Sequence, residues 1–101
     1  MQIRRGVSIN DDMLRALCQK YGVAELSLFG SSAKGTAHAQ SDVDLLVLFE
    51  PDARVTFFTL ARLRRELSEA LGLAVDLVPK DGSKPLIQDE VLASARVLYA
   101  A

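Results

Sequence analysis

The spacing of apolar residues at the start of the chain predicts a helix followed by a strand. The apolar positions that share one helical face are Met13, Leu14, Leu17, Cys18 and Tyr21. Ser8 or Asn10 can cap the start of this helix, and Gly22 is suited to end it. Polar and apolar residues then alternate over residues 25–29, which is typical of a strand with one buried face.

The middle of the chain predicts a strand, a helix and another strand. Residues 42–49 are an apolar run interrupted by two aspartates, which indicates a buried strand. The next apolar stripe has helical spacing and consists of Leu60, Leu63, Leu67, Ala70 and Leu71, with Gly72 placed to end the helix. Residues 74–79 are again apolar around one aspartate and predict a third strand. Elements in this order should form a right-handed parallel crossover over residues 42–79.

The rest of the chain adds a loop and two less regular elements. Residues 30–41 are small and polar, and they predict a loop. Ser83 and Pro85 can start a last short helix, and residues 96–99 are consistent with an edge strand. This order predicts an α/β (α+β) fold in which helices pack on a small mixed sheet of three to four strands. The 101 residues leave room for a single domain, spanning residues 1–101.

Composition and charge restrict the class of protein. The chain has 12 Lys and Arg residues against 13 Asp and Glu residues, and the net charge of −1 argues against bulk binding of nucleic acid. Its single cysteine, Cys18, excludes an intramolecular disulfide and a multi-cysteine metal site, and we expect it in the core. We expect no signal peptide, since no apolar segment follows the first residues, and no apolar run approaches the roughly 20 residues of a membrane span. We therefore expect a cytoplasmic protein without a membrane partner.

Three aspartates within the predicted strands are the first candidates for chemistry. Asp42 and Asp44 are two residues apart on one strand, so their side chains share one face. Asp76 interrupts the third strand in the same way, and neighbouring strands lie about 4.8 Å apart. Three carboxylates on one face suggest hard divalent cations, with Mg²⁺ favoured by ligand type. Two such ions about 4 Å apart can hold the attacking and leaving oxygens of a phosphoryl displacement.

A purely structural interpretation of the same aspartates stays open. In it, Asp42 is a turn residue, and Asp44 and Asp76 form ion pairs with arginines such as Arg54 or Arg96. The two interpretations differ in what compensates the carboxylates, a bound cation or a guanidinium.

The loop before the paired aspartates favours a site for phosphate. Gly30 lets a phosphate approach the backbone closely, and Ser31 offers a hydroxyl and an amide donor. Lys34 adds a positive charge nearby. A glycine-serine pair is common in turns, so its value here depends on its position one loop ahead of Asp42 and Asp44.

On these residues the chain resembles the polymerase-β-type nucleotidyltransferases. The signature is Gly30-Ser31, ten further residues, and then Asp42-Val43-Asp44. Residues 28–35 and 41–47 extend the similarity to the small stand-alone branch, the minimal nucleotidyltransferase (MNT) antitoxins that pair with HEPN toxins. The resemblance covers nearly the whole chain and implies the polymerase-β-like nucleotidyltransferase fold.

The resemblance also implies roles for the site residues. Gly30 and Ser31 would hold the nucleotide phosphates, with Lys34 adding its charge. Asp42 and Asp44 would bind Mg²⁺. In this family the position after the glycine-serine pair is often arginine, and here it is Ser32. The next basic position, also often arginine, is Lys34, which keeps the charge but loses the bidentate fork.

The third acid and the reaction follow from the same resemblance. Asp76 matches the acid that completes the metal site, with two Mg²⁺ ions expected, and it would assist deprotonation of the acceptor. The implied activity is transfer of AMP from ATP to a tyrosine of a partner HEPN toxin, which silences that toxin. Two alternatives remain: an antitoxin that only sequesters its toxin, and a nucleotidyltransferase subunit with a small-molecule acceptor. Because the chain is short, we expect a partner chain or a second copy, as a homodimer, to complete the site.

Two groups on the central helix have no place in this scheme. Phe57 and Phe58 precede the helical stripe and are expected to complete the core, with an interface as the alternative for one of them. Arg62, Arg64 and Arg65 form a basic cluster, which is expected to be a solvated helix face; docking of a partner or of RNA is the alternative.

Overall fold

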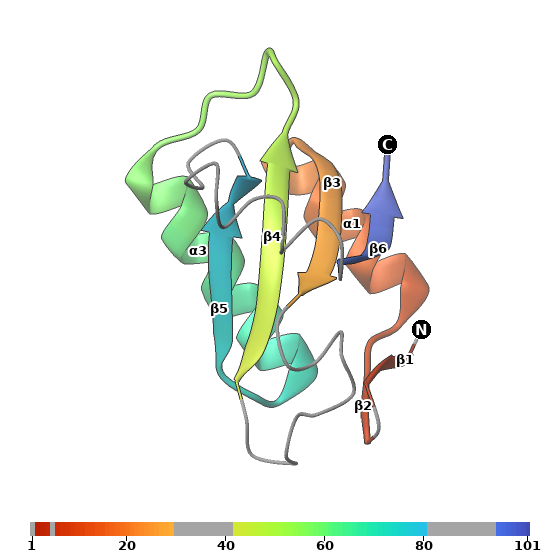
Figure 1. Ribbon diagram of the computed structural model, residues 1–101. Coiled ribbons are helices and arrows are strands. Elements are labelled where there is room, and N and C mark those ends of the chain that lie inside the picture. Colours follow the sequence, from red (N-terminus) through yellow and green to blue (C-terminus); the bar gives the residue numbers. More distant parts are fainter. Residues whose placement is uncertain (1, 5, 30–41, 81–94) are drawn as a thin grey trace.

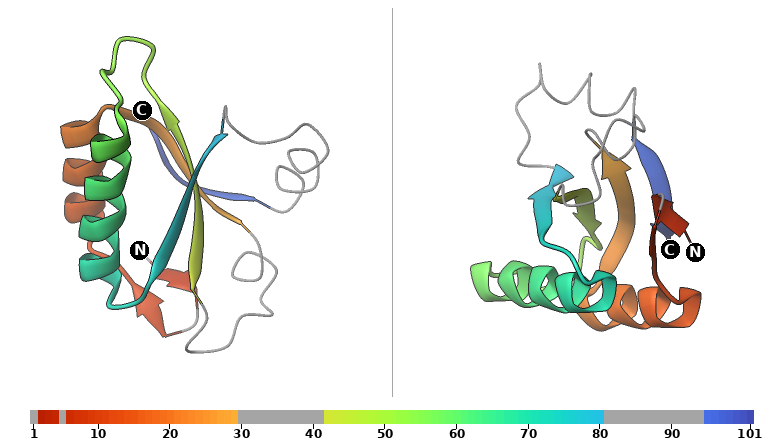
Figure 2. Two further views of the ribbon diagram at one scale, coloured as in Figure 1. Left: turned by 90° about the vertical axis from the view of Figure 1, so that its left-hand side faces the viewer. Right: turned by 90° about the horizontal axis from the view of Figure 1, so that it is seen from below.

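A mixed four-stranded sheet with both long helices on one of its faces organises the chain (Figures 1 and 2). The computed structural model describes residues 2–4, 6–29, 42–80 and 95–101. The sheet has the strand order β5-β4-β3-β6, and a separate two-stranded hairpin pairs β1 with β2. The elements are β1 (Gln2–Arg4), β2 (Val7–Ser8), α1 (Asp11–Tyr21), β3 (Val23–Phe29), β4 (Val43–Phe49), α3 (Phe57–Leu71), β5 (Val75–Pro79) and β6 (Arg96–Ala100).

The pairing of the strands confirms the predicted mixed sheet. β3 pairs antiparallel with β4 on one side and with β6 on the other, whereas β4 and β5 are parallel. Helix α3 connects the two parallel strands, as the strand-helix-strand pattern predicts. The edge strand expected near the end of the chain is also confirmed, as β6.

Side-chain caps fix the starts of both helices. The Asn10 side chain accepts hydrogen bonds from the backbone N–H groups of Asp12 (2.9 Å) and Met13 (3.1 Å). Thr56 and Thr59 form a reciprocal capping box at the start of α3. The helix α3 therefore begins one turn before the apolar stripe that predicts it. Both helices end at glycines, as predicted.

The core fills the space between the two helices and the sheet. It is formed by the inward faces of α1 and α3, one face of each strand, and the N-terminal hairpin; its helical members are Leu14, Cys18, Leu63 and Leu67. Burial raises the pKa of the Cys18 thiol to about 12, so this side chain is neutral and packs as a small apolar group.

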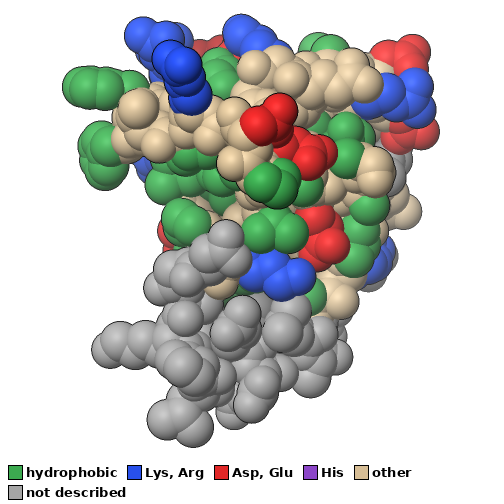
Figure 3. Space-filling model, turned by 90° about the horizontal axis from the view of Figure 1, so that it is seen from above, with side chains coloured by type: hydrophobic (Ala, Val, Ile, Leu, Met, Phe, Trp, Pro, Cys, Tyr) green, Lys and Arg blue, Asp and Glu red, His purple; other side chains and the backbone are tan. Residues whose placement is uncertain are grey.

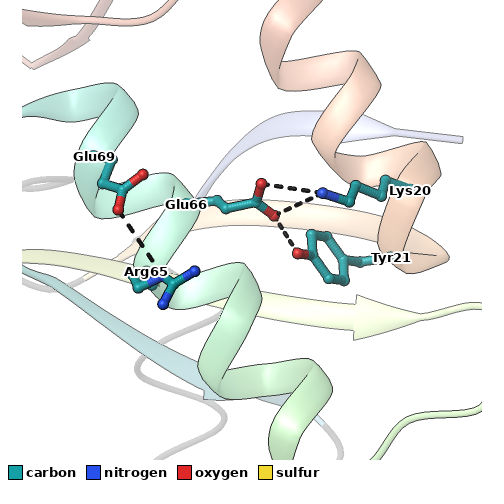
Figure 4. Close-up of polar contacts among 5 residues, drawn as sticks. All are labelled: Lys20, Tyr21, Arg65, Glu66 and Glu69. Carbon is teal, nitrogen blue, oxygen red and sulfur yellow. Dashed lines mark hydrogen bonds and ion pairs between the residues drawn. The ribbon is translucent and has the colours of Figure 1, made fainter.

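Polar contacts join the outer edges of the two helices (Figure 4). The Lys20 ammonium lies 3.1 Å from a carboxylate oxygen of Glu66, and the Tyr21 hydroxyl donates to the same carboxylate. These two donors hold the pKa of Glu66 below its usual range, with the Tyr21 hydrogen bond as the larger cause. The C-terminal turn of α1 is thereby tied to the middle of α3.

One element was missed by the sequence analysis, one prediction lies outside the described residues, and one prediction is wrong. The N-terminal hairpin was not predicted, and the last short helix, expected from Ser83, lies outside the described residues. The prediction that Phe57 and Phe58 complete the core is wrong, since they are 81% and 73% exposed. Helical geometry explains why: Phe58 lies on the side of α3 opposite Leu63 and Leu67, and Phe57 lies on its flank.

Within the described part of the chain, neither helix is long and apolar enough to span a lipid bilayer.

The turn after α1 packs tightly against the segment after β4. Gly22 ends α1 with φ +70°, and its carbonyl accepts a hydrogen bond from the Glu50 N–H at 2.7 Å. A Cβ atom at Gly22 would lie 2.8 Å from the Cβ of Ala53. Gly72 has the same left-handed conformation (φ +73°) at the end of α3, but a Cβ atom there would meet nothing within 4 Å.

Alanine substitutions at the two glycines can separate the cost of backbone strain from the cost of steric overlap. We expect Gly72→Ala to lower the free energy of unfolding by about 1–2 kcal/mol, the cost of a left-handed alanine. Gly22→Ala should lower it by a further 1–3 kcal/mol or so, because its methyl group overpacks against Ala53. Urea unfolding of the two variants measures the difference. The double variant Gly22→Ala/Ala53→Gly should recover the additional loss, and equal losses at the two glycines would contradict the steric argument.

Candidate active site

The three aspartates lie at the starts of two neighbouring parallel strands. Asp44 and Asp76 are each the second residue of their strand and are direct register partners. Partnered residues of adjacent strands point to the same face, so these two carboxylates lie side by side. Asp42 directly precedes β4 and is two residues from Asp44.

These carboxylates belong to the face of the sheet that the helices leave open. Val43 and Leu45 are buried in the core under the helices, and they alternate with Asp44 along β4. Both helices lie on the opposite side of the sheet from the face that carries the aspartates (Figure 2). Asp42 and Asp76 are exposed and Asp44 is half-buried. The site is therefore accessible from outside the core.

The carboxylates are neighbours but do not form a ready-made metal cage. Among the described residues, no three Asp, Glu, His or Cys side chains are grouped closely enough to hold a metal ion. The donor set nevertheless fits Mg²⁺, which prefers carboxylate oxygens and commonly keeps several waters.

The structural alternative with Arg54 and Arg96 does not hold. The Arg96 guanidinium donates to the backbone carbonyl of Gln2 at 3.0 Å and to that of Ile3. Arg54 lies between β4 and α3, at the opposite end of β4 from Asp44. Neither arginine therefore compensates the aspartates.

A second polar group on the same face was missed by the sequence reasoning. Lys80, directly after β5, lies 3.2 Å from a carboxylate oxygen of Glu25 on β3, and the Ser27 hydroxyl donates to the same oxygen at 3.4 Å. The alternation of polar residues along residues 25–29 was the available signal. This pair spans β4 and compensates the charge of Glu25.

The predicted phosphate-binding residues Gly30, Ser31 and Lys34 lie outside the described residues. The strand before them is informative, because its last residue, Phe29, is the register partner of Asp44. The chain therefore leaves β3 at the strand position next to that carboxylate.

Comparison with known proteins supports one family. The model of the nucleotidyltransferase domain family matches residues 11–98. The protein adenylyltransferase MntA of Thermococcus cleftensis is 41% identical over 78 residues, which cover 77% of this chain and 77% of that protein. MntA of Shewanella oneidensis is 35% identical over 74 residues, 71% of this chain and 50% of that protein.

A solved structure gives the same fold. The crystal structure described as a toxin-antitoxin with AMP-PNP superposes with a TM-score of 0.74 at 25% sequence identity, covering 92% of this chain and 75% of that one. The region of β4 and β5 that carries the aspartates lies within the residues that the family model matches.

Removing one of the two neighbouring carboxylates is expected to increase stability. In EDTA, Asp76→Asn should raise the free energy of unfolding by about 0.2–1 kcal/mol, because like charges directly opposite on adjacent strands are destabilising. Asp52→Asn, which removes an exposed carboxylate from the turn after β4, is the matched control and should change stability less. Thermal or urea unfolding provides the measurement. A loss of stability with Asp76→Asn would contradict the argument.

Proposed function

The chain belongs to the nucleotidyltransferase domain family, in the branch of the MntA-type protein adenylyltransferases, and from this premise we propose that it transfers AMP from ATP to a tyrosine of a HEPN toxin. In this role it would be the antitoxin of a toxin-antitoxin pair. The observation that carries the proposal is the register of β4, which aligns Asp44 with Asp76 on one side and with Phe29 on the other. Candidate metal ligands and the start of the glycine-serine segment thus meet at one end of the sheet.

We assign the metal ligands to Asp42, Asp44 and Asp76 and the phosphate contacts to Gly30, Ser31 and Lys34. When bound, two Mg²⁺ ions would neutralise charge on the triphosphate and on the attacking and leaving oxygens. The carboxylates are suited to this role because Asp44 and Asp76 are neighbours on the face of the sheet opposite α1 and α3, and Asp42 and Asp76 are exposed. Asp44 is half-buried and fixed within a strand, so it would anchor the site.

The reaction is an in-line displacement at the α-phosphorus. The tyrosine oxygen forms a bond to the α-phosphorus, the bond from that phosphorus to the bridging oxygen breaks, and pyrophosphate leaves. The tyrosine proton passes to the carboxylate of Asp76, which is exposed and accessible to an incoming acceptor. Catalysis would come from positioning and charge neutralisation rather than from a covalent intermediate on the protein.

The open face of the sheet favours a protein acceptor. Asp42 and Asp76 are exposed, so an acceptor can approach from outside the chain. A toxin surface that carries the tyrosine would cover this face and exclude water from the reacting atoms.

Transfer of AMP can be tested directly by mass spectrometry. The chain, ATP, Mg²⁺ and the HEPN protein encoded beside it should yield a toxin that is heavier by one or more AMP units, with the adduct on tyrosine by fragment analysis. Asp42→Asn and Asp44→Asn should reduce adduct formation at least about 100-fold, because the charge that neutralises the phosphates is lost. The control Asp12→Asn, which removes an exposed carboxylate at the start of α1, should retain the activity.

Other outcomes would assign a different function. If Asp44→Asn formed no adduct but still silenced the toxin, the chain would act by sequestration. Labelling of small acceptors such as aminoglycosides in place of the toxin would indicate a small-molecule nucleotidyltransferase.

Mg²⁺ binding has a readout that does not depend on activity. At ten times its Kd, Mg²⁺ should stabilise the wild-type chain by about 1.4 kcal/mol. Asp76→Asn should gain less, so Mg²⁺ should reduce or reverse the advantage that this variant has in EDTA. Thermal unfolding across a Mg²⁺ titration, with Asp52→Asn as control, tests the assignment; equal stabilisation of wild type and Asp76→Asn would remove Asp76 from the metal site.

A further inference from the structure

The start of α3 displays an apolar cluster that the fold does not use. Phe57 and Phe58 are 81% and 73% exposed, and Val55, two residues earlier, is 42% exposed. We call these three residues the aromatic end of α3. Figure 3 looks down on this end of the molecule and shows hydrophobic side chains projecting at its left-hand edge, next to Lys and Arg side chains. Adjacent exposed aromatic side chains are the residue type enriched at the centres of protein interfaces.

A basic stripe continues from this cluster along the outer side of α3. Phe58, Arg62 and Arg65 are spaced by four and three residues, so they align on the side that points away from the core. Arg62 and Arg65 are both exposed. Arg65 is 3.9 Å from Glu69, an exposed pair that contributes little energy and leaves the guanidinium accessible.

A groove lies beside the aromatic end. It has a volume of about 550 Å³ and runs between the C-terminal end of α1, the segment after β4 and the first turns of α3. Its lining includes the aromatic ring of Phe58 and three cationic side chains, Lys20, Arg54 and Arg62. The lining also includes the carboxylates of Glu50 and Asp52, so the groove can accept a side chain that is apolar in part and polar in part.

The walls of this groove are held in place before any partner binds. Lys20 and Tyr21 are tied to Glu66 on α3 (Figure 4), and Gly22 accepts the hydrogen bond from Glu50. A preorganised groove loses little conformational entropy on binding, which favours specific docking.

This surface is remote from the candidate active site. The groove adjoins the segment that follows β4, whereas Asp44 lies at the other end of that strand. A strand of seven residues is roughly 20 Å long. A single molecule that contacts both places must be a macromolecule rather than a nucleotide.

We propose that the aromatic end of α3, the groove beside it and the outer arginines form the docking surface for the HEPN toxin, which presents an apolar patch rimmed by carboxylates. The inference rests on the proposed function and adds to it the location and chemistry of recognition. Phe57 and Phe58 supply the apolar contact, and Arg54, Arg62 and Arg65 pair with the acidic rim. Docking here holds the toxin while its tyrosine reaches the carboxylates at the other end of the sheet.

Charge complementarity favours an acidic protein over the other candidates. A second copy related by a two-fold axis would place this arginine-rich surface against itself. An RNA strand needs a continuous basic track, but Glu50, Asp52 and Glu69 interrupt the arginines. A protein surface can match such an alternating pattern group by group.

The test measures toxin binding without ATP or Mg²⁺, so that docking is separated from chemistry. Isothermal titration with the HEPN protein encoded beside the chain should show that Phe58→Asp and Arg62→Glu each weaken binding about tenfold or more. Met13→Ser removes a 49%-exposed apolar side chain from α1 and is the matched control, with unchanged affinity. Because all three side chains are largely exposed, the variants should unfold at wild-type urea concentrations, which checks the fold.

Each further outcome points to one conclusion. At limiting toxin, Phe58→Asp should raise the KM for AMP transfer and leave kcat and the Mg²⁺-dependent stabilisation unchanged. Wild-type affinity in both variants, with AMP transfer intact, would overturn the docking surface and leave the proposed function standing. Absence of both toxin binding and AMP transfer in the wild type would overturn both proposals.

Two further outcomes would assign the surface to another occupant. If sedimentation shows a wild-type dimer that Phe58→Asp dissociates, the surface belongs to a second copy. If the wild type binds an RNA oligonucleotide but not the toxin, and Arg62→Glu loses affinity for the RNA, the surface binds RNA.

Discussion

The register between β4 and β5 is the constraint on which the candidate site depends. Val43 is paired with Val75 and Leu45 with Leu77, and all four side chains are buried beneath the helices. A slip by one residue would turn these apolar side chains to the open face, so hydrophobic packing fixes the register firmly. The same register places the carboxylates of Asp44 and Asp76 next to each other, where like charges repel. The core therefore supplies the stability that holds the carboxylates of Asp44 and Asp76 side by side.

The sequence allowed most elements to be predicted because their signals are local. Helix α1 has its cap, its apolar face and its terminal glycine within a few residues, and the aspartates interrupt otherwise apolar strands in a way that burial alone does not explain. The hairpin of β1 and β2 escaped prediction because its strands are only three and two residues long, too short for a periodic pattern. The pair of Lys80 and Glu25 joins residues far apart in the sequence, and no local pattern reports such a contact.

Phe57 and Phe58 show a different limit of sequence reasoning. Their apolar character indicates only that they are costly to leave in water, and a core or a partner can satisfy them equally. Their position on α3, opposite and beside the buried leucines, keeps them out of the core. The molecule is consequently divided along its sheet, with the neighbouring carboxylates at one end and, at the other, exposed aromatic side chains beside a groove lined mainly by polar and charged residues.

Alkylation of the buried Cys18 can report transient opening of the core. With a pKa of about 12, hardly any thiolate exists at neutral pH, and the surrounding side chains exclude reagents. Alkylation can therefore proceed only through conformations in which α1 has separated from the sheet, and its rate reports how often that separation occurs. Since the chain contains no other cysteine, this signal comes from one site. The frequency of this opening can thus be followed at a cysteine that the chain already contains.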